Sequence, residues 1–490
     1  MISTSFDSHW IGGDLVPSDT DTAIDVIDPS TEESIGSVPA GTVSDARRAV
    51  AAARLAFPRW STTPLPARME AVQRLLAGLA ARAEEMAGLI SREVGAPITM
   101  ARRAQVGLAL GMAESFLDIA GQFPFERRAG NSLVVREPVG VVATVTPWNV
   151  PLLLTLQKIV PALLTGCTVV HKPSELTPLH AYLLAEVIAD CDLPPGVFNL
   201  VVGEGPVVGA ELARHPDVDL ISLTGSTRAG RQVAALGADP LKRVHLELGG
   251  KNASVLLDDA DLPSAVRATV DQACFNTGQT CLQWSRLLVP ADRHDEAVAI
   301  AVGHAARYRI GPPAEESTDL GPLVSAAAFA RVNGYVESGI EEGAELAVGG
   351  PGRPAGFDRG YYVRPTVFGH VEEKMTIAQE EIFGPVLAIM AYRDADDAVR
   401  MANGTPYGLH GAVWSADSER AQRFARRLRT GLVDINGGPF NVIAPFGGVK
   451  QSGIGRECGI EGLDGFCEIK SMQLPTDTTA PVGPRLHDTN

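Results

Sequence analysis

The amino-acid sequence predicts an α/β protein whose doubly wound, mainly parallel sheets carry the functional site. Strand-like and helical segments alternate between residues 139 and 248, and a second alternation runs from residue 253 to 448. The chain has 490 residues, which is more than one hydrophobic core usually serves. We therefore expect two or three domains.

The first 123 residues are expected to form a largely helical scaffold. After short β-like pieces, apolar residues recur at helical spacing in three segments, 44–57, 66–94 and 99–122. Ser44 and the acidic residue after it are expected to open the first helix.

The expected strands of both α/β regions are short apolar runs, which are typical of buried parallel sheets. Such a sheet binds its ligand at the carboxyl ends of its strands. The expected strands of the first region are 139–145, 168–171, 197–202, 220–223 and 243–248. Those of the second region are 254–257, 286–289, 366–369, 386–392 and 411–414.

Two segments outside these regions are expected to pair with each other. A turn at Gly130-Asn131 joins extended pieces and predicts a hairpin over 124–138. The segment 466–474 alternates like a half-exposed strand and needs a sheet to join, which this hairpin offers in the same or another subunit. Residues 476–490 are polar and proline-containing, and we expect a flexible tail there.

Composition excludes several classes of partner. The net charge of −16 disfavours nucleic acid and anionic membranes. No pair of the six cysteines forms a C-x-x-C motif or lies among histidines at metal-ligand spacing, so we expect no disulfide framework and no metal. The apolar run 150–170 contains Lys158 and Pro161 and is not a membrane span, and no signal peptide is recognisable. We expect a cytoplasmic protein.

A reactive thiol is expected at Cys281. The small polar turn Asn276–Cys281 lies between a helical segment, 265–275, and a strand, so it presents the thiol between two regular elements. A thiolate is a strong nucleophile, whereas a buried structural cysteine is inert. The residues of the turn alone leave both readings open.

Two strand ends have the residues of a dinucleotide site. The strand 220–223 leads through Gly225 and Ser226 to Gly230 and a helix, a turn that lets the backbone approach a pyrophosphate. Lys172 and Glu175 follow another strand and can bind ribose hydroxyls. Because an acid would repel a 2′-phosphate, NAD is favoured over NADP.

Two further residues can act on a carbonyl compound. Glu247 ends a strand beside paired glycines, where burial would raise its pKa and make it a general base. Asn149 lies at a strand-to-helix turn, where its amide can donate to an oxyanion. Each of these residues, taken alone, would more often be structural.

In their order along the chain, these motifs resemble those of the aldehyde dehydrogenase superfamily from about Trp10 to Pro475. The matching motifs are Pro147-Trp-Asn149, Lys172-Pro-Ser-Glu175, Thr224-Gly-Ser226, Glu247-Leu-Gly-Gly-Lys251, Gly278-Gln-Thr-Cys281, Glu381-Ile-Phe-Gly-Pro385 and Pro445-Phe-Gly-Gly448.

The resemblance implies an NAD-dependent oxidation of an aldehyde to the acid. Cys281 would form a thiohemiacetal, Asn149 and the Cys281 N–H would stabilise its oxyanion, and Glu247 would activate water to hydrolyse the thioester. Presence of Glu247 favours water over coenzyme A as acyl acceptor. The implied cofactor-binding residues are Trp148, Lys172, Glu175, Gly225, Ser226, Gly230, Glu381 and Phe383.

The aldehyde tunnel implied by the resemblance has no lysine or arginine, so we expect an uncharged aliphatic, terpenoid or aromatic aldehyde. Its residues are Val150, Leu153, Leu154, Gln157, Phe275, Leu282 and Phe440. The acid Asp434 departs from the family pattern, and the sequence gives it no role.

The resemblance also implies a domain plan. Residues 1–123 and 139–249 would bind NAD, 250–449 would form the catalytic domain, and 124–138 with 460–475 would form an oligomerisation element. A homodimer or a homotetramer follows from that element. The alternatives are a coenzyme A-acylating or semialdehyde-specific member, an esterase, and a catalytically silent structural homologue.

Overall fold

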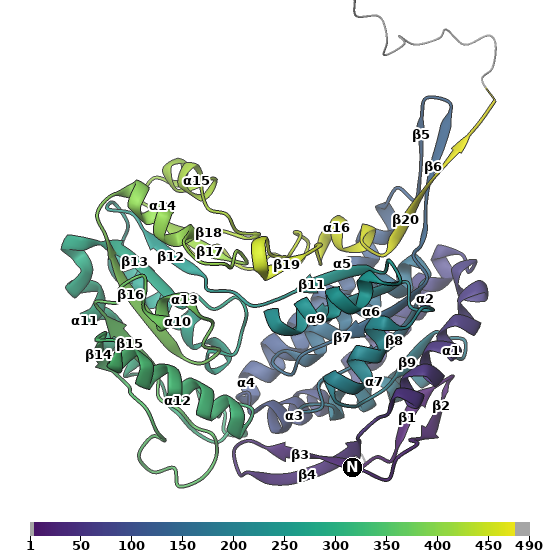
Figure 1. The fold of residues 1–490 in the computed structure, drawn as a ribbon, viewed down its shortest axis with the longest axis horizontal. Coiled ribbons are helices and arrows are strands. Elements are labelled where there is room, and N and C mark those ends of the chain that lie inside the picture. Colours follow the sequence, from purple (N-terminus) through teal and green to yellow (C-terminus); the bar gives the residue numbers. More distant parts are fainter. Residues whose placement is uncertain (1–3, 476–490) are drawn as a thin grey trace, which may run out of the picture.

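The computed structural model describes residues 4–475 and consists of two α/β units with a narrow hairpin that projects beyond them (Figure 1). This confirms the predicted fold class. The tail predicted at 476–490 lies outside the described residues.

An eight-stranded sheet forms the first unit, in the order β19-β11-β10-β7-β8-β9-β1-β2. Strands β11, β10, β7, β8 and β9 pair in parallel, and the others are antiparallel to their neighbours. Most of the parallel strands are buried throughout, as expected for strands covered on both faces. The bounds are β1 (Ser8–Ile11), β2 (Asp14–Pro17), β7 (Val141–Val145), β8 (Thr168–Lys172), β9 (Phe198–Leu200), β10 (Leu220–Thr224), β11 (Arg243–Glu247) and β19 (Gly453–Ile454).

A seven-stranded sheet forms the second unit, in the order β14-β15-β16-β13-β12-β17-β18. Only the edge strand β14 is antiparallel to its neighbour. The bounds are β12 (Ala253–Leu256), β13 (Arg286–Pro290), β14 (Glu345–Val348), β15 (Thr366–Gly369), β16 (Val386–Tyr392), β17 (Gly411–Trp414) and β18 (Asp434–Ile435).

Helices surround both sheets (Figure 1). The α-helices of the first unit are α1 (Val43–Ser61), α2 (Leu65–Ala81), α3 (Ala83–Val94), α4 (Ile98–Met100), α5 (Leu108–Gln122), α6 (Pro151–Thr165), α7 (Leu179–Ala189), α8 (Ala210–Arg214), α9 (Thr227–Ala238) and α16 (Gly459–Asp464). Those of the second unit are α10 (Leu262–Cys274), α11 (His294–Ala305), α12 (Ala326–Glu341), α13 (Thr376–Gln379), α14 (Ala395–Asn403) and α15 (Ser418–Ala425). No helix among residues 4–475 is long and apolar enough to cross a membrane.

Three helical predictions need correction. The helix expected over 66–94 breaks at Arg82, whose guanidinium binds Glu85 and Glu186 while its backbone leaves the helical region. The helix expected over 99–122 contains a π-helical stretch, Ala101–Gly107. The first helix is capped by Thr42 and not by Ser44, because Thr42 and Asp45 satisfy each other's backbone N–H groups.

The projecting sheet has three antiparallel strands, β5 (Glu126–Ala129), β6 (Ser132–Pro138) and β20 (Cys467–Gln473), in the order β20-β6-β5. The predicted hairpin is confirmed. The terminal strand joins the hairpin of its own chain along its whole length (Figure 1). A separate two-stranded sheet pairs β3 (Ala23–Asp28) with β4 (Glu33–Pro39).

The capping carboxylate of Asp45 is fully buried in a network with Thr42, Ser18 and Arg48. Burial opposes its ionisation, but hydrogen bonds donated by its neighbours hold the pKa of Asp45 well below its usual value. Its contribution to stability is therefore present above the unfolded-state pKa of about 3.9 and is lost as the pH falls below it.

We predict that Asp45→Ala lowers the free energy of unfolding by roughly 2 to 4 kcal/mol at pH 7, because the buried His9 ring, the Thr42 N–H and the partly exposed Arg48 guanidinium lose their shared partner. Urea unfolding checks this, with the exposed Asp21→Ala as a matched control. The deficit should shrink toward pH 3; a deficit that does not change with pH would contradict the role of the charge.

Candidate active site

The thiol segment is a buried turn that ends in a partly exposed cysteine. After α10 the chain makes one 3-10 turn, Phe275–Gly278, in which Asn276 and Thr277 have positive φ angles. Asn276, Thr277, Gln279 and Thr280 are buried, while Cys281 is partly exposed. The sequence predicted a turn that exposes the thiol, but not that the rest of the turn is buried.

Gly278 packs this turn against the backbone of Gly384, two residues before β16. Its φ is +73°, and a Cβ atom there would lie 2.2 Å from the backbone of Gly384. A side chain is therefore excluded by conformation and by contact.

Asn149 lies where β7 leads into α6, and its side chain faces the turn. Its Nδ2 donates to the carbonyl of Gln279 at 2.9 Å. Its own carbonyl accepts from Gln105 and from Asn276, both at 2.9 Å. Because an amide nitrogen carries two protons, the fixed Asn149 side chain keeps a second N–H for a ligand.

Glu247 ends β11, and both its carboxylate oxygens are buried without a hydrogen-bond partner. Burial, and next the nearby Glu457, raise the pKa of Glu247 well above its usual value. Glu457 is itself paired with the buried Lys158, which also donates to Thr224 at 2.7 Å. A buried carboxyl without partners in a cleft is suited to take up a proton.

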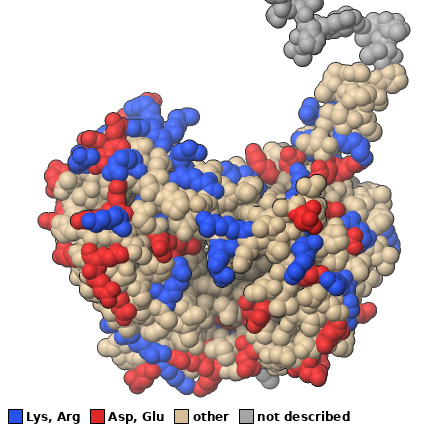
Figure 2. All heavy atoms as spheres, in the orientation of Figure 1, with Lys and Arg blue, Asp and Glu red and all other residues tan. Residues whose placement is uncertain are grey.

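These groups share a cleft of about 510 Å³ between the two units, visible as a hollow in the surface (Figure 2). Nine of the predicted site residues line it: Trp148, Asn149, Leu154, Gly225, Ser226, Glu247, Cys281, Glu381 and Phe383. Loops that follow strands of both sheets line the cleft, so each unit forms only part of it.

The surroundings of Cys281 favour the protonated form of its thiol. Although part of its surface is exposed, burial and then the carboxylates of Glu381 and Glu247 raise the pKa of Cys281 to about 12. A positive charge beside the thiol would reverse part of this shift.

One side of the cleft is formed by the start of α9. Ser226 caps the helix by accepting the N–H of Ala229 at 3.2 Å. Gly230 lies against Leu248, where a Cβ atom would be 2.5 Å from a methyl carbon. The helix therefore packs closely on the residue that follows Glu247, and its N-terminus faces the cleft.

Glu381 and Phe383 form the opposite side. Glu381 accepts the N–H of Gly250 at 2.9 Å, and Arg331 donates to its backbone carbonyl. The ring of Phe383, at a positive φ, meets Trp148 edge to face at 5.4 Å. Two aromatic rings from different units thus border the same space.

Several predicted residues lie away from the cleft lining. Lys172 is buried at the end of β8 and donates to Pro173 at 2.8 Å and to Glu175 at 3.2 Å. Gln157 is buried, and its amide donates to the thiol of Cys458 at 3.1 Å.

The other predicted tunnel residues have different surroundings. Leu153 and Leu282, like Cys281, are partly buried and pack against one apolar cluster. Val150 caps α6, and Phe275 and Phe440 are 40% and 36% exposed.

Sequence reasoning missed part of the lining. Leu176, Arg228, Ser325, Ala328 and Arg331 border the cleft, and none belongs to a recognisable motif. Lys158 and Glu457 were missed as neighbours of Glu247. Here a signal existed, because a lysine inside an apolar helix requires a buried partner.

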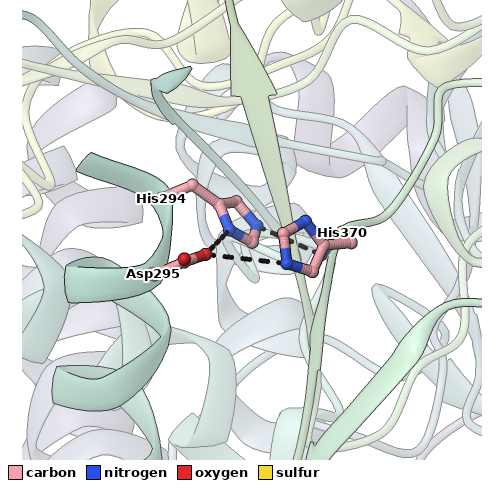
Figure 3. A group of neighbouring side chains, drawn as sticks. All are labelled: His294, Asp295 and His370. Carbon is pink, nitrogen blue, oxygen red and sulfur yellow. Dashed lines mark hydrogen bonds and ion pairs between the residues drawn. The ribbon is translucent and has the colours of Figure 1, made fainter. Parts of the chain in front are cut away.

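A separate cluster of His294, Asp295 and His370 has metal-ligand residue types (Figure 3). The backbone N–H of His370 donates to Nε2 of His294 at 3.0 Å, so the neutral ring carries its proton on Nδ1. That nitrogen lies 3.0 Å from Asp295 and donates to it. A metal would have to displace this proton, so the cluster is better described as a hydrogen-bonded group.

A thiol, an amide donor and a buried carboxyl with a raised pKa around one cleft are typical of enzymes that attack a carbonyl carbon with sulfur. Comparison with known proteins narrows this class. The aldehyde dehydrogenase family model matches residues 15–472. The chain therefore belongs to the aldehyde dehydrogenase family, as its motifs predicted.

Individual members of the family are similar to this chain over nearly its whole length. A 3-succinoylsemialdehyde-pyridine dehydrogenase from a Pseudomonas species is 45% identical over 94% of this chain and 97% of its own length. Aldehyde dehydrogenase C of Pseudomonas syringae, solved with NAD⁺ and octanal, is 45% identical with a TM-score of 0.95, covering 96% of this chain and 98% of that one. A Mycobacterium tuberculosis aldehyde dehydrogenase solved with NAD⁺ is 42% identical with a TM-score of 0.95, covering 98% and 100%.

We predict that Gly278→Ala destabilises the protein by about 2 to 3 kcal/mol, because the new methyl group meets backbone atoms in a left-handed conformation. Urea unfolding measures this. Gly303→Ala is the matched control, since a Cβ atom there meets nothing within 4 Å and helix propensity favours alanine. Equal stability of the two variants would contradict the packing described for the turn.

Proposed function

We propose that this chain oxidises an uncharged aldehyde to its carboxylic acid, with NAD⁺ as hydride acceptor. The observation that carries the proposal is the placement of Cys281, Asn149 and Glu247 on one cleft between two α/β units. The NAD⁺ complexes of the relatives from P. syringae and M. tuberculosis support the choice of cofactor.

The chain's residues fit such a cofactor. The start of α9, with Gly225 and Ser226, offers backbone N–H groups to a pyrophosphate, and Gly230 lets that helix approach the strand end. Lys172 and Glu175 would hold the adenosine ribose, and Glu175 would repel a 2′-phosphate. On this proposal the first unit is the cofactor-binding domain.

Other residues would hold the nicotinamide end. Glu381, already fixed by Gly250, would bind the ribose, and the rings of Trp148 and Phe383 would border the nicotinamide. When bound, NAD⁺ supplies a hydride acceptor and a positively charged ring that lowers the pKa of the Cys281 thiol.

The chemistry then follows from the geometry of the cleft, where Cys281 of the second unit meets Asn149 and Glu247 of the first. The thiolate of Cys281 attacks the aldehyde carbon and forms a thiohemiacetal whose oxyanion accepts hydrogen bonds from Asn149 Nδ2 and the Cys281 N–H. Loss of hydride from that carbon restores the carbonyl as a thioester on Cys281. The fixed Asn149 amide supplies its donor without further reorganisation.

Glu247 completes the cycle. Its carboxylate takes a proton from water, the resulting hydroxide attacks the thioester carbon, and the acid leaves as the thiolate departs. The raised pKa of Glu247 makes its carboxylate a stronger base than that of an ordinary glutamate.

An uncharged substrate is consistent with the tunnel residues, among which there is no lysine or arginine: Val150, Leu153, Leu154, Gln157, Phe275, Leu282 and Phe440. The octanal in the P. syringae complex belongs to this class. The Pseudomonas relative is named for a semialdehyde joined to a pyridine, which keeps a ring-bearing semialdehyde among the candidates.

We further propose a cytoplasmic homodimer or homotetramer. Strand β20 is exposed along most of its length, with Ile469 61% exposed. Within residues 4–475, the two outer strands of the projecting sheet, β20 and β5, each pair with β6 alone. Such an edge is suited to pair with a second copy.

Absorbance at 340 nm tests the function. With NAD⁺ and a panel of aldehydes, we expect kcat/KM for octanal to exceed that for succinate semialdehyde by at least about tenfold. Cys281→Ala should abolish NADH formation while its unfolding midpoint stays unchanged. No reduction of NAD⁺ or NADP⁺ by any aldehyde, with ester hydrolysis retained, would favour the esterase alternative.

Glu247→Gln should slow turnover by about a hundredfold to ten-thousandfold, because it removes the general base. In the wild type, kcat should rise with pH through the raised pKa of Glu247, since only the ionised carboxylate accepts a proton. The variant should lose this alkaline rise. A variant that keeps both the rate and the pH profile would exclude Glu247 as the base.

A further inference from the structure

Three consecutive carbonyl groups, those of Cys281, Leu282 and Gln283, are contacted by side chains of the second unit. Asn252 Nδ2 donates to the Cys281 carbonyl at 2.7 Å and to the Gln283 carbonyl at 2.9 Å. The Leu282 carbonyl accepts from Nε2 of Gln272 at 3.4 Å and lies 3.1 Å from Nδ1 of His410. The backbone that follows the nucleophile is therefore fixed by Asn252 and Gln272, with the His410 ring beside it.

Asn252 is bound to His410, and His410 is in turn bound to Asp434. The backbone N–H of His410 donates to Oδ1 of Asn252 at 3.0 Å, which orients the Asn252 amide. Nε2 of His410 lies 3.0 Å from Oδ2 of Asp434. His410 is buried, and the Asp434 side chain is 22% exposed.

Sheet register places the group. Asn252 precedes β12 and His410 precedes β17, and these parallel strands pair Ala253 with Gly411. Asp434 opens β18, which pairs with β17. Neighbouring parallel strands thus bring Asn252 and His410 to one level of the sheet, beside the segment that enters β13. Asp434 pairs with Ala412, two residues beyond His410.

The position of the ring proton decides which group His410 binds. The indole Nε1 of Trp284 donates to Nδ1 of His410 at 3.2 Å, and an indole nitrogen can only donate. The ring proton therefore lies on Nε2 and is donated to Asp434. If it moved to Nδ1, the ring would donate to the Leu282 carbonyl and the buried Trp284 N–H would lose its acceptor.

We propose that Asp434 and His410 are positioning residues for the thiol segment. Asp434 keeps the ring proton on Nε2, so Nδ1 of His410 accepts the N–H of Trp284, which directly follows Gln283. The backbone N–H of His410 orients the Asn252 amide, which holds the Cys281 and Gln283 carbonyls in register with the oxyanion site. The inference rests on the proposed role of Cys281. It gives a role to the acid at 434, which the family pattern left without one.

The backbone of Cys281 matters twice in this arrangement. Its N–H is one of the two proposed oxyanion donors. The same N–H also stabilises the thiolate and offsets part of the effect of burial on the pKa of Cys281. A shift of this segment would therefore weaken both the oxyanion site and the thiolate.

The test compares Asp434→Ala with Asp434→Asn. The alanine variant should lower kcat by between about tenfold and about a hundredfold, with KM for NAD⁺ within about threefold of the wild type. The asparagine variant should restore most of kcat, because its Oδ1 still accepts from Nε2. Asp295→Ala is the matched control: Asp295 binds His294 at the same 3.0 Å in the same unit, at the cluster of Figure 3.

A second readout does not depend on turnover. The other five cysteines are buried, so iodoacetamide labels Cys281 selectively, and mass spectrometry of its peptide follows the rate. Asp434→Ala should slow alkylation of the NAD-free enzyme by at least about threefold, with wild-type rates in Asp434→Asn and Asp295→Ala.

Equal losses in Asp434→Ala and Asp434→Asn would overturn the proposal. So would an Asp434→Ala enzyme with a lower unfolding temperature but wild-type kcat and alkylation. If the wild type oxidises no aldehyde while alkylation responds as described, the proposed function fails and the positioning role stands.

Discussion

Burial of a polar turn between two sheets is the constraint on which this site depends. Residues 276–280 leave water almost completely, so their amide side chains and backbone groups must find partners inside the protein. Those partners come from both units. Asn149, at the end of a strand of the first sheet, binds the Gln279 carbonyl, and the backbone of Val324 in the second unit binds the Gln279 side chain at 3.0 Å.

The same hydrogen bonds give the turn a chemical function. A segment held by both units cannot move without breaking buried bonds, each worth about 1 to 3 kcal/mol when left unmade. The thiol at its end therefore has a fixed place relative to the Asn149 amide. This is the preorganisation that makes an oxyanion donor effective, because no reorganisation is needed when charge develops.

A second constraint is electrostatic. Glu247 and Glu457 are both buried and lie close together. Among the described residues, Lys158 is the one cation that forms an ion pair with either carboxylate, and its partner is Glu457. The charge on Glu247 is therefore disfavoured, and its carboxyl has no hydrogen-bond partner among the described residues. The buried Glu247 carboxyl lowers the stability of the fold, and the same surroundings make its carboxylate a better proton acceptor.

Local sequence predicted the elements well, and the tertiary interactions less well. The strands 366–369, 386–392 and 411–414 have the predicted bounds, because short apolar runs between turn residues have few alternatives. The break at Arg82 was missed because it depends on a partner, Glu186, a hundred residues away. In the site, motif residues such as Cys281 were recognisable. Local patterns do not show how strands and helices are placed in space. They therefore did not predict the lining residues of α12 or the link from Asp434 to the thiol segment.

The most direct test of the central claim is the mass of the enzyme during turnover. Glu247→Gln enzyme, mixed with NAD⁺ and octanal and quenched in acid, should carry one octanoyl group, and peptide mapping should place it on Cys281. An enzyme that forms NADH without an adduct, or with the adduct on another cysteine, would contradict the thioester mechanism and the role of the buried turn.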